Sequence, residues 1–285
     1  MKKTLLFRVV YEDDRIAAVD KASGIAVCAD RWDDSRERLD KLLAAFLNIE
    51  KVFIVHRIDR DTSGLVVFAK NTDIHRKLSA AFENRRVYKK YIAVVRGRPA
   101  WKETVCDLPL VPDGNKQHHT IIDKFQGKKS VTSFRLLGSA GNYSILEAVP
   151  ETGRTHQIRV HLASMGHSIV CDELYGNSKP LFLSAFKPGW RGNPEEEKPL
   201  LGRLGLHAAG LFIPEKVTDT LVGGAKMVID TEKVTDTTAK TVIDTVSGLT
   251  LNAPLPRDMA AVAKQFDKLG ALSDNSFLTA GISPE

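Results

Sequence analysis

Short stretches of alternating apolar and polar residues, and brief apolar runs bounded by turn residues, recur along this chain. Both patterns are typical of β-strands, the first with one covered face and the second with two. They predict strands at residues 7–11, 16–20, 53–55, 65–70, 87–96, 120–122, 130–137 and 143–149. Because successive side chains of a strand point to opposite faces, we expect Tyr91 to share a face with Ala93 and Val95.

A second pattern, in which apolar residues recur three or four positions apart, predicts amphipathic helices. It occurs at residues 39–46, 72–84, 156–165 and 258–268. Asn71 and Thr155 precede two of these helices as expected N-caps, and Gly166 is placed to end the third helix. Since strands outnumber helices and their connections are irregular, we predict an α+β fold and not regular βαβ winding.

The length of 285 residues is enough for one large domain or two smaller ones. We predict a single domain over residues 1–270, followed by a flexible tail at 271–285. The Pro- and charge-rich residues at about 177–203 predict an exposed insertion. A second insertion is expected at about 216–246, where the sequence Lys-Val-Thr-Asp-Thr occurs twice. Two copies are too few for a solenoid, and we assign this duplication no chemistry.

The distribution of charge says more than the overall composition. Hydrophobic residues make up 43% of the chain and charged residues 27%, which is ordinary for a globular protein. The net charge of +6 is only a weak sign of polyanionic partners. Between residues 76 and 102, however, nine cationic residues accompany the single acid Glu83. A solvated surface and a binding site for phosphates explain this segment equally well.

Several classes of protein lack support in the sequence. Cys28, Cys106 and Cys171 are odd in number and far apart, so they predict no disulfide framework and no Cys-x-x-Cys metal site. Arg8 interrupts the apolar start, and no stretch approaches the roughly 20 apolar residues of a membrane span. Nucleotide-binding glycine motifs and the Gly-x-Ser-x-Gly motif of serine hydrolases are absent. We therefore expect a soluble protein of the reducing cytoplasm.

The polar loop at residues 56–64 is the first candidate for chemistry. Asp59 lies there beside His56, Arg57 and Arg60, an electropositive setting that keeps a carboxylate ionised. Such an aspartate can act as a nucleophile or as a base. Loop aspartates more often cap turns, so the loop alone does not establish catalysis.

Two further positions carry similar alternatives. A partly buried Arg159 needs a carboxylate partner, because an unpaired buried charge is costly, and Asp59 is one candidate. Tyr91 is expected either to pack in the core or to stack on a nucleic-acid base. The pattern of residues leaves these alternatives open.

Four motifs follow one another along the chain. They are His-Arg-Ile-Asp-Arg-Asp-Thr-Ser-Gly-Leu at 56–65, Lys-Lys-Tyr-Ile-Ala-Val-Val-Arg-Gly at 89–97, Gly-Arg-Thr-His-Gln-Ile-Arg-Val-His-Leu at 153–162 and Leu-Gly-Leu-His-Ala at 204–208. In sequence and in order, they resemble the motifs of the RluA family of RNA pseudouridine synthases. The resemblance covers roughly residues 7–214 and, in addition, Leu249–Leu255.

The resemblance implies a fold and an activity. The fold would contain a mixed, mostly antiparallel sheet flanked by helices and loops. The activity would be the isomerisation of specific uridines to pseudouridine in structured RNA, either ribosomal or transfer RNA, after the target base is flipped out of its stack. The family needs no metal and no other cofactor, and its members are expected to act as monomers.

The resemblance also implies roles for individual residues. Asp59 would start the break and re-formation of the glycosidic bond, Arg159 would pair with Asp59, and Tyr91 would stack on the uracil. Arg57 would enter the space that the flipped uridine leaves. The full set of implied substrate-binding residues is His56, Arg57, Thr62, Arg154, His156, Gln157 and Leu206.

The chain also departs from the family pattern. Ala22 stands where the family usually has the proline of a Lys-Pro-Ser-Gly turn. Many relatives carry an N-terminal S4-type RNA-binding domain, which we do not expect before Phe7, so target choice would depend on the catalytic domain and its insertions. A catalytically silent RNA-binding or RNA-chaperone protein on the same fold is the main alternative, and a nucleoside-directed hydrolase is the weaker one.

Overall fold

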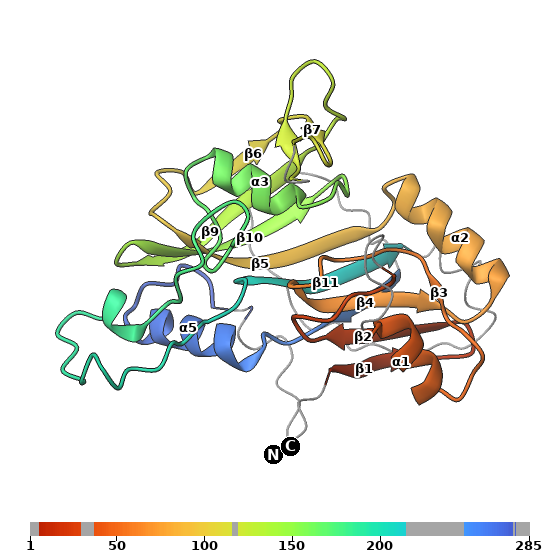
Figure 1. Cartoon of the computed structure of the whole chain (residues 1–285), viewed down its shortest axis with the longest axis horizontal. Helices are drawn as coiled ribbons and strands as arrows, with labels where there is room; N and C mark the ends of the chain where they lie inside the picture. Colours follow the sequence, from red (N-terminus) through yellow and green to blue (C-terminus); the bar gives the residue numbers. More distant parts are fainter. Residues whose placement is uncertain (1–5, 30–36, 116–118, 215–247, 276, 278–285) are drawn as a thin grey trace.

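The computed structural model describes residues 6–29, 37–115, 119–214, 248–275 and 277, and a ten-stranded sheet runs through its centre (Figure 1). The sheet consists of β1 (Phe7–Glu12), β2 (Ile16–Lys21), β3 (Phe53–Ile54), β4 (Ser63–Ala69), β5 (Tyr88–Arg96), β6 (Glu103–Cys106), β9 (Thr132–Ala140), β10 (Tyr143–Pro150), β11 (Leu206–Pro214) and β12 (Gly248–Asn252). A separate two-stranded sheet pairs β7 (Leu110–Val111) with β8 (Ile121–Ile122). The helices are α1 (Leu39–Phe46), α2 (Thr72–Glu83), α3 (Gln157–Ser164), α5 (Arg257–Lys268) and the short 3-10 helix η1 (Leu183–Ala185).

The order of the strands makes the sheet mixed but mostly antiparallel. Neighbouring strands follow the order β1-β2-β4-β11-β5-β10-β9-β6, with β3 on β4 and β12 on β11. Within this described sheet, only the pairing of β4 with β11 is parallel. Each predicted strand overlaps an observed one, and the predicted α+β class is confirmed.

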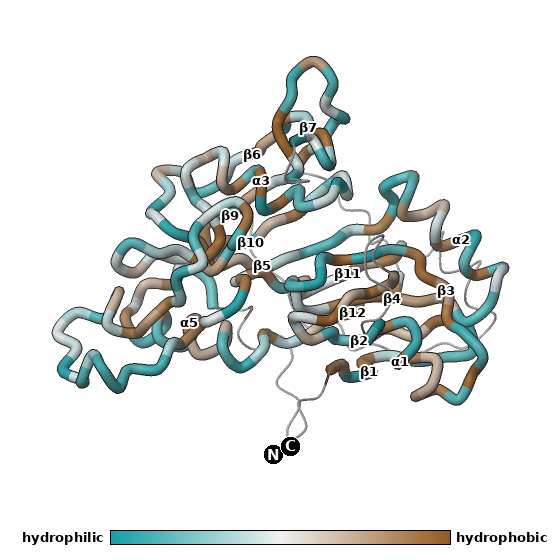
Figure 2. Tube along the Cα trace, in the orientation of Figure 1, coloured by the Kyte–Doolittle hydropathy of each residue, from teal (hydrophilic) through white to brown (hydrophobic). Residues whose placement is uncertain are grey.

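The first half of the sheet is covered by helices on both faces because its strands are apolar on both faces. In β2, Ala17 and Val19 pack in the same cluster as Leu39 and Leu43 of α1. The intervening residues of β2 point to the other face, towards the apolar stripe of α2. Figure 2 shows the strands of this half as largely hydrophobic, with polar residues outside.

The second half repeats this arrangement around β5. Ile92 and Val94 pack with α5, whereas Ala93 and Val95 pack with α3 on the opposite face. Tyr91 joins the second of these groups, as the alternation predicted. In Figure 1, α3 and α5 accordingly lie on opposite sides of the sheet.

The two halves meet where β4 and β11 run side by side. Gly64 pairs with Ala208 there and has a φ of 111°, a conformation that favours glycine. A Cβ atom on Gly64 would lie 2.3 Å from the Ala208 carbonyl oxygen. The glycine of the first motif is therefore required by the close approach of the two backbones.

One predicted cap is wrong. The helix α3 begins after His156, which has a left-handed φ of 54°, and no side chain caps the helix there. Thr155 therefore lies one residue before the cap position. Gly166, with a φ of 80°, follows the end of the helix as predicted.

Two predicted surface segments are more firmly packed than expected. Leu181 and Leu201 are fully buried and form a β-bridge, so the insertion at 177–203 is anchored by its ends. Residues 271–275 are not a free tail, because Leu272 bridges Gly138 in β9. The segment 216–246 lies outside the described residues.

None of the described helices has the length and apolarity needed to cross a membrane.

Candidate active site

The loop that carries Asp59 connects β3 to β4 and is fixed by the turn that follows β2. The Lys21 side chain is 1% exposed and donates to three backbone carbonyls at 2.8–2.9 Å, one of them that of Arg60. The Thr62 amide donates to the Asp59 carbonyl at 3.1 Å and closes a tight turn. The loop is therefore held by a buried lysine amine, whose pKa burial lowers to about 7, and does not rely on contacts with solvent.

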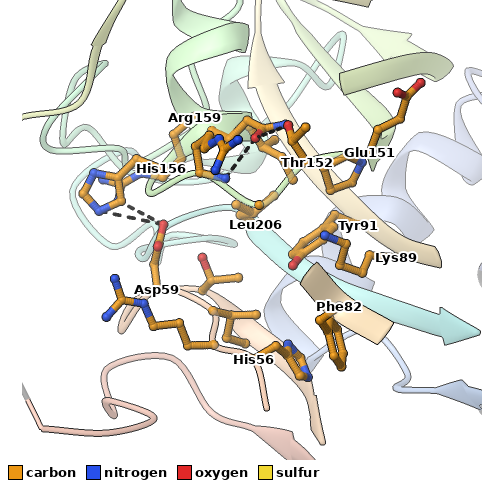
Figure 3. Close-up of a pocket in the computed structure, with 18 of the residues that line it drawn as sticks. His56, Asp59, Phe82, Lys89, Tyr91, Glu151, Thr152, His156, Arg159 and Leu206 are labelled. Carbon is orange, nitrogen blue, oxygen red and sulfur yellow. Dashed lines mark hydrogen bonds and ion pairs between the residues drawn. The ribbon is translucent and has the colours of Figure 1, made fainter. Parts of the chain in front are cut away.

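Two carboxylates share the guanidinium of Arg159. Asp172, which is buried, accepts Nε and Nη2 of Arg159 at 2.8 Å each. The remaining Nη1 donates to Asp59 Oδ2 at 3.4 Å (Figure 3). The contact predicted between Arg159 and Asp59 is thus present, but the stronger partner of the arginine is Asp172.

The charge of Arg159 is stabilised by these two acids. Burial acts to lower the pKa of the guanidinium, but hydrogen bonds and charge from Asp172, and then Asp59, outweigh it and raise the pKa. The same contacts hold the pKa of Asp172 below its usual value, against the effect of burial. Arg159 is therefore a permanent cation beside the Asp59 carboxylate.

His156 forms another side of the site. Its Nδ1 lies 2.8 Å from the hydroxyl of Tyr175, and its Nε2 lies 3.9 Å from Asp59 Oδ2. Burial lowers the pKa of His156; Asp59 opposes this shift and the charge of Arg159 adds to it. A neutral imidazole is thus held next to the carboxylate by Tyr175.

Tyr91 forms a wall of a cavity of about 400 Å³ that opens beside Asp59, within the usual size range of ligand pockets. Its hydroxyl has no hydrogen-bond partner among the described residues, and Figure 3 shows it directed towards the interior of the pocket. Burial, and next the charge of Asp59, raise the pKa of the phenol above its ordinary value. Tyr91 therefore keeps its proton at neutral pH and presents a flat ring to the cavity.

Two predicted substrate-binding residues, His56 and Gln157, also hold the architecture of the site. His56 Nε2 accepts the Val67 amide at 3.0 Å, and its ring stacks on Phe82 with centroids 4.5 Å apart. Burial lowers the pKa of His56 to about 3, so the ring remains a neutral acceptor. His56 borders the cavity; its Nε2 is engaged by the Val67 amide, so the proton of the neutral ring lies on Nδ1.

Gln157 is engaged still more completely. Its Oε1 accepts the Thr152 hydroxyl at 2.7 Å and the Arg154 amide at 3.0 Å. Its Nε2 donates to the Val131 carbonyl and to Thr132 Oγ1, both at 2.9 Å. Every donor and acceptor of this buried amide is therefore used, and Gln157 shapes the cavity wall and leaves no group for a substrate.

The remaining predicted residues line the cavity with groups that the protein leaves available. Arg57 is exposed at the mouth, and Arg154 uses only its Nε, on the carbonyl of Lys129 at 3.3 Å. Thr62 is 1% exposed, and its hydroxyl has no partner among the described residues. Leu206, at the start of β11, is a buried apolar contact.

The cavity is electropositive overall. Five cationic side chains and three carboxylates line it, and the cations are Arg57, Arg85, Lys89, Arg154 and Arg159. Burial lowers the pKa of Lys89 to about 8, so this amine titrates near physiological pH. In the described part of the chain, no group of three or more His, Cys, Asp or Glu is arranged to hold a metal ion, and we assign no metal ligand. The site offers an ionised carboxylate, an aromatic wall and several cations for an anionic ligand.

A match to a protein-family model shows the family of this chain. The model described as RNA pseudouridylate synthase matches residues 15–164, which include Asp59, Tyr91 and Arg159. The chain belongs to this family. The resemblance to the RluA family of pseudouridine synthases that the four motifs indicated is thereby confirmed.

Curated relatives of this pseudouridylate synthase family agree. The chain is 37% identical over 179 residues to ribosomal large subunit pseudouridine synthase D of Zymomonas mobilis, covering 60% of this chain and 56% of that protein. It is 35% identical over 182 residues to dual-specificity RNA pseudouridine synthase RluA of Vibrio vulnificus, covering 62% of this chain and 72% of that one. The chain thus spans little more than half the length of the first of these relatives.

Solved structures of family members share the fold. Human RNA pseudouridylate synthase domain containing 4 aligns with a TM-score of 0.63 at 20% identity, over 91% of this chain and 92% of that one. Human RNA pseudouridylate synthase domain containing 1 aligns with a TM-score of 0.58 at 24% identity, over 93% of this chain and 98% of that one. The pseudouridylate synthase fold therefore extends well beyond the residues that the family model matches.

Sequence reasoning missed Asp172, Tyr175 and Thr152. Asp172 and Tyr175 lie in the loop after α3, where no periodic pattern marks them. A usable signal was the buried arginine itself, because two hydrogen-bonding ends of a guanidinium call for more than one carboxylate.

Proposed function

We propose that this protein isomerises uridines in structured RNA to pseudouridine, with Asp59 as the catalytic carboxylate. The observation that carries the proposal is the placement of Asp59 between Arg159 and the cavity walled by Tyr91. Three motifs far apart in the sequence meet there. The names of the relatives, which act on ribosomal large subunit RNA or have dual specificity, support RNA as the substrate.

The chemistry that we propose is balanced within the substrate. The bond between C1′ and N1 of the uridine breaks, the uracil turns within the cavity, and a bond forms between C1′ and C5. C5 loses a proton and N1 gains one, so the product is an isomer and no oxidant, reductant or co-reactant is needed. Asp59 starts the sequence by attack on the nucleoside or by removal of a proton.

The other residues act on the base and the phosphates. Tyr91, held as a neutral phenol, stacks on the uracil and can relay the C5 proton only by giving up its own. Thr62 lines the cavity that would receive the flipped nucleotide. Arg57 and Arg154 at the mouth meet the RNA backbone, where guanidinium groups bind phosphates well.

Ribosomal RNA and transfer RNA are the substrate classes that we propose. Both contain folded regions with unpaired uridines, which the cavity can accept once the base leaves its stack. We further propose that the protein works in the cytoplasm as a monomer and without a membrane.

The decisive experiment replaces Asp59. We expect Asp59→Asn and Asp59→Ala to release no tritium from RNA labelled at C5 of uridine, while both variants still bind RNA. Asp61→Asn is the matched control, because Asp61 is a neighbouring carboxylate paired with the exposed Arg60 at 3.3 Å. Full activity of purified Asp59→Ala would overturn the proposal, and so would a wild-type protein that binds RNA but releases no tritium.

A further inference from the structure

An arm beside α3 carries a bare aromatic ring at its tip. The arm is described over residues 107–115 and 119–131, and its strands β7 and β8 project from the sheet (Figure 1). Phe125, in the turn after β8, is 98% exposed, more than any other large hydrophobic side chain among the described residues. Its ring contributes nothing to the core.

The turn that holds Phe125 is well defined by hydrogen bonds. Asp123 Oδ1 accepts the amides of Phe125 at 2.8 Å and Gln126 at 3.0 Å, and the Asp123 carbonyl accepts the amide of Gly127 at 2.9 Å. The first two bonds lower the pKa of Asp123, so the cap is ionised at neutral pH. A Cβ atom at Gly127 would lie 2.2 Å from the Asp123 carbonyl oxygen, which restricts this position to glycine. The ring is thus presented on a preformed turn.

The surroundings of the ring are cationic. Lys124, Lys128 and Lys129 are all exposed, and none of them has an acidic partner among the described residues. A single exposed hydrophobic residue is ordinary by itself. An aromatic ring set among unpaired cations is instead the composition of surfaces that bind single-stranded nucleic acid, where rings stack on bases and cations meet phosphates.

The base of the arm borders the candidate active site. The carbonyl of Lys129 accepts Nε of Arg154, which lines the cavity, at 3.3 Å. A second contact near the active site is made before β8, where the amide of Thr120 donates at 2.9 Å to the hydroxyl of Tyr175, which also contacts His156. Four peptide units separate Lys129 from Phe125, a reach of at most about 14 Å. That reach corresponds to roughly four stacked nucleotides at about 3.4 Å each.

We propose that Phe125 stacks on an unpaired base of the RNA, a few nucleotides from the uridine in the active site. Lys124, Lys128 and Lys129 contact the phosphates on either side of that base. The arm therefore selects RNA in which a second base near the target is unpaired. This inference rests on RNA being the substrate, as proposed above.

The test compares two RNA probes of equal length and charge. One is a fluorescein-labelled hairpin with an unpaired loop, and the other is a fully paired RNA duplex. We expect Phe125→Ala to weaken binding to the hairpin about 5- to 100-fold, the usual range for loss of one stacked base. Binding to the duplex stays at the wild-type level, and Phe125→Trp restores most of the affinity for the hairpin.

Salt dependence and a matched control separate stacking from charge. Lys128→Ala reduces the slope of log affinity against log salt by about 0.7, as for one phosphate contact on a single strand, whereas Phe125→Ala leaves the slope unchanged. Phe46→Ala, at a phenylalanine on α1 that is 66% exposed, leaves hairpin binding unchanged.

Two outcomes would overturn the inference. The first is wild-type hairpin affinity in Phe125→Ala, which would point to a protein partner for the ring. The second is an equal loss for hairpin and duplex. Tritium release by the wild-type protein is measured in parallel. If the proposed isomerisation is wrong, the wild type releases no tritium. If only the proposed stacking by Phe125 is wrong, the wild type still releases tritium.

Discussion

At the scale of single residues, the strongest constraint in the site acts on the guanidinium of Arg159 and not on the carboxylate of Asp59. Arg159 is 5% exposed and makes two short bonds to Asp172, against one longer bond to Asp59. The orientation of Arg159 is therefore set before any RNA binds. Asp59 thus lies beside a cation whose position is fixed by another carboxylate.

Asp172→Asn tests whether Asp172 orients Arg159 for its contact with Asp59. The variant keeps the shape of the side chain but removes the charge that orients Arg159, so we expect kcat to fall about 10- to 100-fold with little change in KM. The melting temperature is measured alongside, since a buried arginine with one carboxylate fewer also costs stability. Unchanged kcat in a variant that folds as well as the wild type would contradict the positioning role.

The sequence located the residues that we propose for the catalytic site better than those that support them. Asp59, Tyr91 and Arg159 stand in motifs with recognisable neighbours, and the structure brings all three to one cavity. Gln157 stands in such a motif too, yet its amide is consumed by backbone and hydroxyl groups. A motif shows that a polar residue is needed, but only the fold shows whether the ligand or the protein uses it.

At the scale of elements, the parallel junction of β4 and β11 contains a buried histidine. His207 is fully buried, with Nε2 3.3 Å from the Ala253 carbonyl and Nδ1 3.0 Å from Ser63 Oγ. The carbonyl can only accept, so Nε2 carries the proton and Nδ1 accepts from Ser63. Burial lowers the pKa of His207 to about 4, and the ring is neutral in the folded protein.

Because His207 is buried as a neutral ring, we predict that the free energy of unfolding decreases at acidic pH. The unfolded chain protonates His207 below about pH 6.5, and the folded chain only below about pH 4, so the unfolded state binds more protons in between. Stability attributable to His207 therefore falls as the pH drops through this window, by about 2 kcal/mol between about pH 7 and about pH 5. Urea unfolding at both pH values measures it.

The comparison for this prediction is His207→Gln, which cannot titrate. The variant is less stable at every pH, but its loss between the two pH values should be smaller than that of the wild type by the stated amount. Equal losses in the two proteins would show that His207 is not held neutral.

Strands and helices were predictable from sequence where burial determines the pattern of apolar residues. Their first and last residues were less predictable. The alternation in β5 follows from which face each side chain covers, and it assigned Tyr91 to the correct face. The start of α3 was placed wrongly because the strained backbone of His156 replaces an ordinary cap. That strain is explained by tertiary contacts of its ring with Tyr175, which no local pattern encodes.

At the scale of the whole molecule, the last described residues are part of the sheet structure. Ala271 and Ser273 exchange backbone hydrogen bonds with β9 at 3.1 and 2.8 Å, and Asp274 forms an ion pair with Arg135 at 3.1 Å. The expected flexible tail was inferred from its position at the end of the sequence, and that position does not report the open side of β9.

Truncation measures how much this segment contributes. We expect deletion of residues 271–285 to lower the free energy of unfolding by about 2–3 kcal/mol, since two backbone hydrogen bonds and apolar contacts are lost. Deletion of residues 278–285 is the control, because it leaves the contacts of residues 271–275 in place. A similar melting temperature for both deletions would contradict the docking of 271–275.

The central position of β11 has a consequence for folding during synthesis on the ribosome. In the described sheet, β4 and β5 do not pair with each other and are joined through β11, which starts at Leu206, long after the family match ends at residue 164. The emerging chain must hold two half-sheets apart, with open edges, until this late strand is made. Asp59 and Tyr91 belong to opposite halves, so the cavity that both residues line cannot be complete until synthesis has passed β11.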